Sequence, residues 1–378
     1  MIQTPLILHE ATFDAAQIAA LREKPVWKEV DIYASQLGEL AEIRFPADAE
    51  ARQAFLNANP PSDLAGVWAY YPWSGVLLHC VGEDALLELR TNRNKLLITA
   101  DEQAQLAACT VAVAGMSVGS GIALSCVYSG FSGTIKLADF DTLETANLNR
   151  LRESLAAVGS SKLTLTTQRI YELNPFATII PFENGIRDDT LEAFLQDPAT
   201  TVVVDEIDDF KMKVQLRVSA KAYGVPLLMF TSLGDSVLVD VERYDLDPES
   251  ELFNGLLPGL GEDIQQKGVI TTEDAKRYAV QLVGVEYVPT RALQSLTEIG
   301  STLVGRPQLY STIAVDGGLA AYVIRAIVLG KPLKSGRYLL RFSDIFNLSA
   351  EEVTDDAFRQ ESLSKLFGEQ APQSSPTQ

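Results

Sequence analysis

From residue 110 onward, short apolar segments alternate with longer segments that have the pattern of helices. Strands that alternate with helices predict a parallel, doubly wound sheet. The strands are almost continuously apolar, which is typical of a sheet whose two faces are both covered. The chain therefore predicts an α/β fold built on a mostly parallel sheet. The predicted strands are TVAVA, TIKLADFD, TIIPFE, TVVVDE and PLLMFT.

The first 87 residues do not follow this alternation. Residues 12–25 predict a helix, with Thr12 or Asp14 near its N-cap and Pro25 just beyond its end. The segments GVWAYYPWSGVLLHC and ALLELR predict either strands throughout or one strand and a helix, because such short runs do not separate the two. We interpret the aromatic residues of VWAYYPW as core packing rather than as a ligand site. We expect residues 1–87 to form an N-terminal α+β accessory lobe, with peptide or substrate recognition as its candidate role.

The remaining segments complete one core domain over residues 88–348. DSVLVDVERYD predicts an extension of the sheet, and the segments near 240–305 predict an inserted, partly mobile lobe. Residues 308–330 predict a long helix that ends at Gly330, followed by a last strand, RYLLRF. We expect residues 349–378 to form a C-terminal helix and a disordered tail, because EQAPQSSPTQ has the composition of a disordered segment.

The charge and the cysteines limit the compartment and the partners. The chain has 31 basic and 50 acidic residues, and its net charge of −19 repels a nucleic-acid backbone. No apolar run reaches the roughly 20 residues that span a bilayer, and the N-terminus lacks the pattern of a signal peptide. The 3 cysteines form no C-x-x-C pair, as suits a reducing compartment. We expect a cytoplasmic protein without a membrane partner, for which a nucleic-acid partner is disfavoured.

The stretch VAGMSVGSG connects the first apolar strand to a helix. Free backbone N–H groups and the positive end of the helix favour a phosphate at such a turn. The dinucleotide-binding pattern G-x-G-x-x-G is incomplete, because Ser117 and Ser120 stand where the second and third glycines would be. By itself the stretch is as typical of a plain tight turn as of a phosphate site. Its glycines are Gly115, Gly119 and Gly121.

Asp139 makes a nucleotide site the better interpretation. It lies at the end of the second strand, about 24 residues after Gly115, where an acidic residue accepts hydrogen bonds from ribose hydroxyl groups in Rossmann-like folds. Arg150 and Lys162 follow, and they supply the positive charge that a polyphosphate requires. The polar residues between Asp139 and Arg150 are Asp141, Asn147 and Asn149.

An acidic cluster, DEIDDF, ends the fourth predicted strand. The carboxyl ends of parallel strands meet at one edge of a sheet, where ligands bind. Carboxylates at this edge suit Mg²⁺, a hard cation that prefers oxygen ligands. The sequence therefore predicts a magnesium site close to the phosphates. The acidic residues are Asp205, Glu206, Asp208 and Asp209.

Together these motifs resemble the ThiF/MoeB/HesA group of the ubiquitin-activating-enzyme superfamily. The most specific string is DFDTLETANLNR, and a lysine on the next helix and DEIDDF accompany it. The resemblance is close over residues 88–235 and looser over 308–345. It implies a Rossmann-like domain that binds ATP and Mg²⁺. It also implies an adenylyltransferase reaction, in which a carboxylate becomes an acyl-adenylate and pyrophosphate is released.

The resemblance also implies roles for individual residues. Asp139 would bind the ribose of ATP, and Asp208 would hold Mg²⁺. Asn147 and Arg150 would contact the phosphates, with Lys162 beside them. The other residues expected around the nucleotide are Gly115, Ser117, Gly119, Asp141 and Asn149.

The segment LRTNRNKLLITADEQAQL matches the family's stretch before the first core strand. By this resemblance its second arginine, Arg93, would be an arginine finger that reaches the ATP of the partner subunit. The resemblance therefore implies a homodimer. It adds Arg93 to the expected catalytic residues Arg150, Lys162 and Asp208.

Four departures from the family pattern limit what can be carried over. The Gly-rich turn is one residue short and carries serines, Asp209 replaces an asparagine, and Lys213 replaces an arginine. No cysteine follows Cys126, which excludes the paired C-x-x-C zinc site of many members and a nucleophilic cysteine beyond the fourth strand. The chain therefore resembles a zinc-free, catalytic-cysteine-free bacterial branch that has a YYPW segment before the core.

Three functions stay open. The first is an ATP-dependent adenylating enzyme, whose substrate would be the C-terminus of a small carrier protein, a ribosomal peptide or a small carboxylic acid. The second is an NAD-type oxidoreductase, which Asp139 and the turn allow but Arg150 and Lys162 disfavour. The third is a catalytically silent nucleotide-binding module, which the altered turn and Asp209 suggest. The family also has a tRNA-base dehydratase branch, against which the acidic charge counts.

Overall fold

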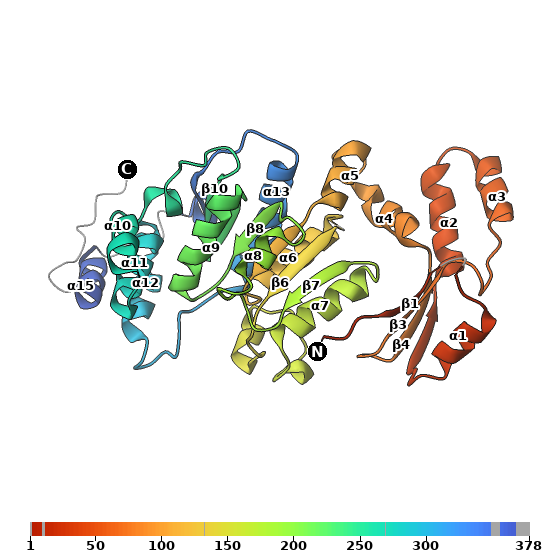
Figure 1. Ribbon diagram of the computed structural model, residues 1–378, viewed down its shortest axis with the longest axis horizontal. Helices are drawn as coiled ribbons and strands as arrows, with labels where there is room; N and C mark the ends of the chain where they lie inside the picture. Colours follow the sequence, from red (N-terminus) through yellow and green to blue (C-terminus); the bar gives the residue numbers. More distant parts are fainter. Residues whose placement is uncertain (1, 10–11, 132, 269, 349–355, 368–378) are drawn as a thin grey trace. The chain divides into compact units, whose positions relative to one another are not determined.

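Two sheets organise the residues that the computed structural model describes, which are 2–9, 12–131, 133–268, 270–348 and 356–367 (Figure 1). By their contacts the residues form two compact units. The domain boundaries expected from the sequence stay a prediction. Unit 1 comprises Met1–Cys109, Cys126–Ile135 and Thr164–Pro181, and unit 2 comprises Thr110–Ser125, Lys136–Leu163 and Phe182–Gln378.

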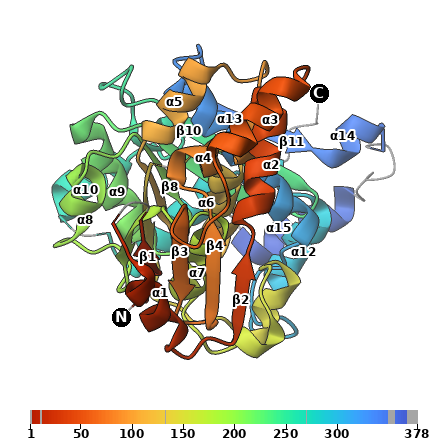
Figure 2. The same cartoon turned by 90° about the vertical axis from the view of Figure 1, so that its right-hand side faces the viewer.

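Unit 1 contains a four-stranded sheet with the strand order β1-β3-β4-β2, which can be followed across Figure 2. β3 pairs antiparallel with β1 and β4, and β2 pairs parallel with β4. GVWAYYPWSGVLLHC therefore forms two strands, whereas ALLELR lies in the helix α4. The strands are β1 (Leu6–Leu8), β2 (Lys28–Asp31), β3 (Val67–Tyr71) and β4 (Val76–Cys80).

The helices of unit 1 begin with α1 (Ala15–Arg22), whose N-cap is Asp14, one of the two predicted caps. The Asp14 carboxylate accepts a hydrogen bond from the backbone N–H of Gln17. The predicted core packing of the aromatic segment is confirmed, because every residue of β3 is buried and Trp68 is 0% exposed. The other helices are α2 (Tyr33–Arg44), α3 (Ala49–Ala58), α4 (Glu83–Thr91), η1 (Asn92–Asn94) and α5 (Ala100–Ala108).

The larger sheet has seven strands in the order β11-β10-β9-β8-β5-β6-β7 and is mostly parallel, which confirms the predicted doubly wound α/β fold. β8 pairs parallel with β5 and β9, whereas β10 pairs antiparallel with β9 and β11. Arg337 of β11 holds Asp240 of β10 through two hydrogen bonds of 2.7 and 2.8 Å. The strands are β5 (Val111–Ala114), β6 (Thr134–Ala138), β7 (Thr178–Phe182), β8 (Val202–Asp205), β9 (Leu227–Ser232), β10 (Ser236–Glu242) and β11 (Gly336–Arg341).

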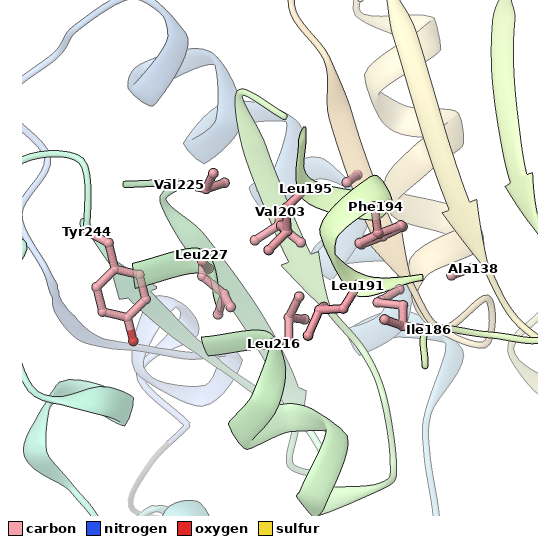
Figure 3. Close-up of a cluster of buried hydrophobic side chains, with 13 residues drawn as sticks. Ala138, Ile186, Leu191, Phe194, Leu195, Val203, Leu216, Val225, Leu227 and Tyr244 are labelled. Carbon is pink, nitrogen blue, oxygen red and sulfur yellow. The ribbon is translucent and has the colours of Figure 1, made fainter. Parts of the chain in front are cut away.

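Amphipathic helices bury the apolar strands of this sheet. Figure 3 shows one core cluster of unit 2, in which Leu191 and Phe194 of α8 and Leu216 of α9 lie against apolar residues of the strands. α9 ends at Gly224, whose φ of +64° is the left-handed conformation that favours glycine at a helix end, as predicted. The helices are α6 (Gly119–Tyr128), α7 (Lys162–Leu173), α8 (Leu191–Gln196) and α9 (Phe210–Tyr223).

The predicted insertion between β10 and β11 is helical. Tyr278 stacks on Phe210 of α9 with 5.9 Å between the ring centroids, and Leu293 is buried in one cluster with Leu363. The predicted mobility of this lobe stays a prediction, and the predicted disordered tail EQAPQSSPTQ lies outside the described residues. The elements are η4 (Leu252–Gly255), α10 (Leu260–Lys267), α11 (Thr272–Val283), η5 (Val285–Tyr287), α12 (Thr290–Glu298), α14 (Phe342–Phe346) and α15 (Asp356–Phe367).

The predicted long helix is α13 (Tyr310–Val328). Among the described helices it is the one whose length and composition would let it cross a membrane, with 19 residues, a mean hydropathy of 1.4 and 56% of its apolar stretch buried. It contacts β8, β9 and β10. Its apolar character is therefore also that of a core helix of unit 2.

Candidate active site

The Gly-rich turn between β5 and α6 is held by close backbone packing. Gly115 has a φ of +92°, and a Cβ there would lie 2.3 Å from the carbonyl oxygen of Glu206. A Cβ on Gly119 would lie 2.6 Å from a methyl group of Val113, whereas Gly121 has open space around it. Two of the three glycines are therefore required by the packing, and Gly115 ties the turn to the end of β8.

Asp139 fixes the turn from the next strand. It is 8% exposed, and its two carboxylate oxygens accept hydrogen bonds from the backbone N–H groups of Met116 and Asp141. Burial raises the pKa of Asp139, and these two N–H groups act against that shift. Because a carboxylate oxygen can accept more than one hydrogen bond, both oxygens can still bind hydroxyl groups. The predicted contact with a ribose fits this geometry and stays a prediction.

Lys162 is buried close to these carboxylates. Its Nζ lies 2.9 Å from Oδ2 of Asp141, whose side chain is 52% exposed, and Lys162 also lowers the pKa of Asp139. A fixed ammonium group of this kind can attract a phosphate. A phosphate at this place would have to share the ammonium group with Asp141, the residue that balances its charge here.

Arg150 lies against the Gly-rich turn. Its Nε donates a long hydrogen bond of 3.4 Å to the hydroxyl of Ser117, and its Nη1 donates one of 2.9 Å to the amide oxygen of Asn149. Burial lowers the pKa of Arg150, while nearby Asp208 raises it and nearby Arg306 lowers it. The structure therefore brings Arg150, Ser117, Asn149 and Asp208 together, and it adds Arg306, which the sequence did not single out.

Asn147 has a local structural role. It is buried, and its amide oxygen accepts a hydrogen bond of 3.0 Å from the backbone N–H of Glu144, which caps the short helix η2 (Thr145–Asn149). Only its amide N–H groups are left for a phosphate. Its predicted phosphate contact stays a prediction that depends on these donors.

The acidic cluster at the end of β8 divides into separate roles. Asp205 is fully buried and pairs with Lys213 at 3.1 Å and with Arg217. Burial alone raises the pKa of Asp205, but these two cations bring it below its usual value. Asp209 caps α9, because its carboxylate accepts the backbone N–H of Lys211 at 2.9 Å. These two carboxylates are therefore occupied within the chain.

Asp208 is the exposed carboxylate of this cluster, and no described residue forms a hydrogen bond or ion pair with it. Among the described residues, no group of three His, Cys, Asp or Glu side chains is arranged to hold a metal ion. Mg²⁺ commonly binds through one or two carboxylates together with the phosphates of a nucleotide. Asp208 fits such a shared site, whereas Asp205 and Asp209 do not.

Sequence reasoning missed Arg217, which organises the core behind this edge. It is 0% exposed and pairs with Asp205 of β8 and, at 2.7 Å, with Glu242 of β10. Its guanidinium also lies 3.9 Å from the ring centroid of Phe253. Arg217 stands four positions after Lys213 on α9, so both cations reach the same buried carboxylate. That spacing, after an aspartate at a strand end, was the available signal.

A second missed group is an acidic pair on either side of β9. Asp316 of α13 is fully buried, accepts a hydrogen bond of 2.6 Å from the hydroxyl of Ser232, and leaves Oδ1 without a partner among the described residues. Burial raises the pKa of Asp316 to about 6. Burial also raises the pKa of Glu206 well above its usual range; Lys213 acts against this shift, and Asp316 adds to it. Nothing in the sequence around Asp316 distinguishes it from a surface aspartate.

Arg93 and the cysteines lie elsewhere. Arg93 is exposed on η1 in unit 1, so its predicted contact with a partner subunit's nucleotide stays a prediction. All three cysteines are buried and free. Burial raises the pKa of both Cys80 and Cys109 to about 12 and raises that of Cys126 as well. Because the thiolate is the nucleophilic form, none of them is suited to forming a thioester.

These features can be compared with known proteins. Residues 91–361 match the model of the ThiF family. The chain belongs to the ThiF family. The resemblance predicted from DFDTLETANLNR and DEIDDF is thereby confirmed, and so is the Rossmann-like fold that it implied.

Three relatives of this ThiF-family chain carry different names. An uncharacterised protein of Mycobacterium tuberculosis, MT1398, is 36% identical over 324 residues, which cover 86% of this chain and 43% of the relative. A tRNA threonylcarbamoyladenosine dehydratase of Bacillus subtilis is 32% identical over 41% of this chain and 60% of its own length. A molybdopterin-synthase adenylyltransferase of Salmonella typhimurium is 31% identical over 41% of this chain and 63% of its own length. The chain thus spans less than two thirds of each of these relatives.

Proposed function

We propose that this protein is an ATP-dependent adenylating enzyme. The observation that carries the proposal is the set of contacts around the Gly-rich turn. Asp139 anchors the turn, Arg150 donates to its Ser117, and Lys162 lies close enough to lower the pKa of Asp139. Such a site can hold a ribose and a polyphosphate together. The molybdopterin-synthase adenylyltransferase among the relatives supports the same reaction class.

In the proposed reaction a carboxylate oxygen of the substrate attacks the α-phosphorus of ATP. The bond from that phosphorus to the bridging oxygen breaks, pyrophosphate leaves with its electron pair, and an acyl-adenylate is formed. Asp139 would orient the ribose, while Arg150 and Lys162 would stabilise negative charge on the phosphates. Asp208 would hold Mg²⁺, which supplies further charge neutralisation when it is bound.

The acyl group must then leave the adenylate without a cysteine of this chain. The three thiols are buried and their pKa values are raised, so an external nucleophile or a group of the substrate itself would complete the transfer. The proposed substrate is the C-terminus of a small carrier protein, a ribosomal peptide or a small carboxylic acid. We also propose a cytoplasmic homodimer in which Arg93 reaches the partner subunit's nucleotide.

The test is pyrophosphate exchange into ATP with a panel of peptides and carboxylic acids. We expect Asp208→Asn to lose most of the exchange activity, because the free carboxylate would hold Mg²⁺. Asp101→Asn, which removes an exposed carboxylate from α5, is the matched control and should keep the activity. Thermal stabilisation by NAD but not by Mg·ATP would overturn the proposal and favour the oxidoreductase.

A further inference from the structure

A largely apolar pocket lies at the end of β9, within unit 2. Its volume is about 190 Å³. Its walls come from the end of β9, from α11 and α12 of the inserted lobe, and from the segment that leads into α13 (Figure 1). The lining residues are Ser232, Leu233, Gly234, Ala279, Val280, Val283, Val288, Ala292, Leu293, Leu296, Arg306 and Pro307.

The pocket sits at the edge of the sheet where a ligand of this fold is expected. β9 runs parallel to β8, with Val204 opposite Leu228, so the carboxyl ends of both strands lie at the same edge. The carboxylate of Glu206, just after β8, accepts the backbone N–H of Phe230 near the end of β9 at 3.0 Å. The pocket therefore begins beside the strand end that leads to Asp208. In open α/β sheets, ligands bind outside the carboxyl ends of the strands.

Arg306 joins the pocket to the candidate nucleotide site. Among the described lining residues it is the only charged one. Its side chain is exposed and has no hydrogen bond or ion pair with any described residue. It lies close enough to Arg150 to lower the pKa of that arginine. Two neighbouring guanidinium groups, one of them without a counter-ion, form a place that favours an anion.

The size and the chemistry of the pocket restrict its occupant. Aliphatic cavities of about 150 Å³ bind benzene in other proteins, so this pocket can hold a phenyl ring or a branched aliphatic chain. A peptide backbone would need hydrogen-bond partners inside the pocket. The one hydroxyl in the lining, that of Ser232, already donates to Asp316 at 2.6 Å. The geometry favours an apolar group without amides.

We propose that this pocket is the acyl subsite and that it takes the apolar body of a small monocarboxylic acid. The inference rests on the proposed adenylation. The carboxylate would lie at the mouth of the pocket beside Arg306, where one of its oxygens can attack the α-phosphorus of ATP. The apolar body would lie between α11 and α12. Among the three substrate classes proposed above, this selects the small carboxylic acid.

The substrate series tests the pocket through pyrophosphate exchange with acetate, isovalerate, 4-methylvalerate, phenylacetate and peptides that end in glycine or leucine. Each further buried methylene should lower the KM of the acid about fourfold. We expect 4-methylvalerate and phenylacetate to be used at concentrations at least about tenfold below that of acetate. Exchange supported by the peptides and not by the free acids would overturn the inference.

Two variants on α12 test the place. Ala292→Phe fills the pocket and should raise the KM of phenylacetate more than about tenfold, while the KM of ATP stays unchanged. Gln294→Phe adds the same side chain at an exposed position of the same helix and should leave both values unchanged. Arg306→Gln should raise the KM of every acid in the series by a similar factor, because it removes the carboxylate partner and leaves the apolar walls.

Thermal stability keeps the two proposals apart. Stabilisation by Mg·ATP with no exchange for any acid or peptide would contradict the proposed adenylation. Exchange with acids of all sizes at similar KM, unchanged in Ala292→Phe, would retain the adenylation and remove the acyl subsite from this pocket. If Ala292→Phe fails to fold, Leu296→Trp, which fills the pocket from the same helix, replaces it and should give the same loss for phenylacetate.

Discussion

Replacement of Asp316 by asparagine should stabilise the protein at neutral pH and leave its stability nearly unchanged at acid pH. Asp316 is fully buried on α13, and burial raises its pKa to about 6. An unfolded aspartate ionises near pH 3.8. The folded state therefore binds the proton more tightly than the unfolded state, and ionisation of Asp316 at neutral pH destabilises the fold.

The size and the sign follow from that shift. About two pKa units correspond to about 3 kcal/mol of unfolding free energy, because one unit is about 1.4 kcal/mol. This stability is fully present below about pH 4 and is lost as the pH rises through about 6. Asparagine stays neutral at every pH, so Asp316→Asn should be more stable than the parent by up to about 3 kcal/mol at pH 7.

The assay is urea unfolding of the parent and of Asp316→Asn between pH 4 and pH 7.5. Far-UV circular dichroism follows the helices of both units. Tryptophan fluorescence follows unit 1, because all 3 tryptophans, Trp27, Trp68 and Trp73, belong to it. Asp188→Asn, which removes an exposed carboxylate from unit 2, controls for the loss of one negative charge. A difference between Asp316→Asn and the parent that does not change with pH, or a less stable variant at pH 7, would refute the reasoning.

Other predictions concern the ion pairs, the turn and the dimer. Arg217→Met should lower the unfolding free energy by about 3–5 kcal/mol, because it leaves Asp205 and Glu242 buried without a cation; urea unfolding measures this, and a loss below about 1 kcal/mol would contradict it. Gly115→Ala should abolish stabilisation by Mg·ATP in a thermal shift, whereas Gly121→Ala, at a position with open space, should keep it. Arg93→Ala and Asp208→Asn should each be inactive in pyrophosphate exchange. When they are mixed and exchange subunits, activity should return to at most about half per heterodimer; no recovery despite verified exchange would place Arg93 in its own subunit's site or make the protein a monomer.

The strands and helices of the core were predictable because their apolar patterns are long enough. TVAVA and TVVVDE became β5 and β8, and the helix stop at Gly224 was correct. ALLELR was ambiguous because six residues do not separate a strand from a helix, and its place in α4 depends on packing within unit 1. The Gly-rich turn, Asp139 and the free carboxylate of Asp208 could be chosen from spacing alone.

The buried charges could not be predicted from the sequence. Arg217 and Asp316 stand on helices where charged residues usually face water. Their partners, Glu242 and Ser232, lie far away along the chain, and only the fold brings them together. The same limit explains why DEIDDF suggested one metal cluster. Three of its four carboxylates are instead occupied by Lys213 and Arg217, by the backbone N–H of Phe230, and by the first turn of α9.

The pairing of β10 with β11 has a consequence for the order of folding. Asp240 and its partner Arg337 are 97 residues apart in the sequence, and the whole inserted lobe is synthesised between them. Until β11 arrives, β10 is an open sheet edge that carries a carboxylate without its cation. Open edges of this kind pair readily with other chains, and contacts of large sequence separation form slowly. A nascent chain that ends within the lobe therefore presents an aggregation-prone edge, which only the last sixth of the sequence can close.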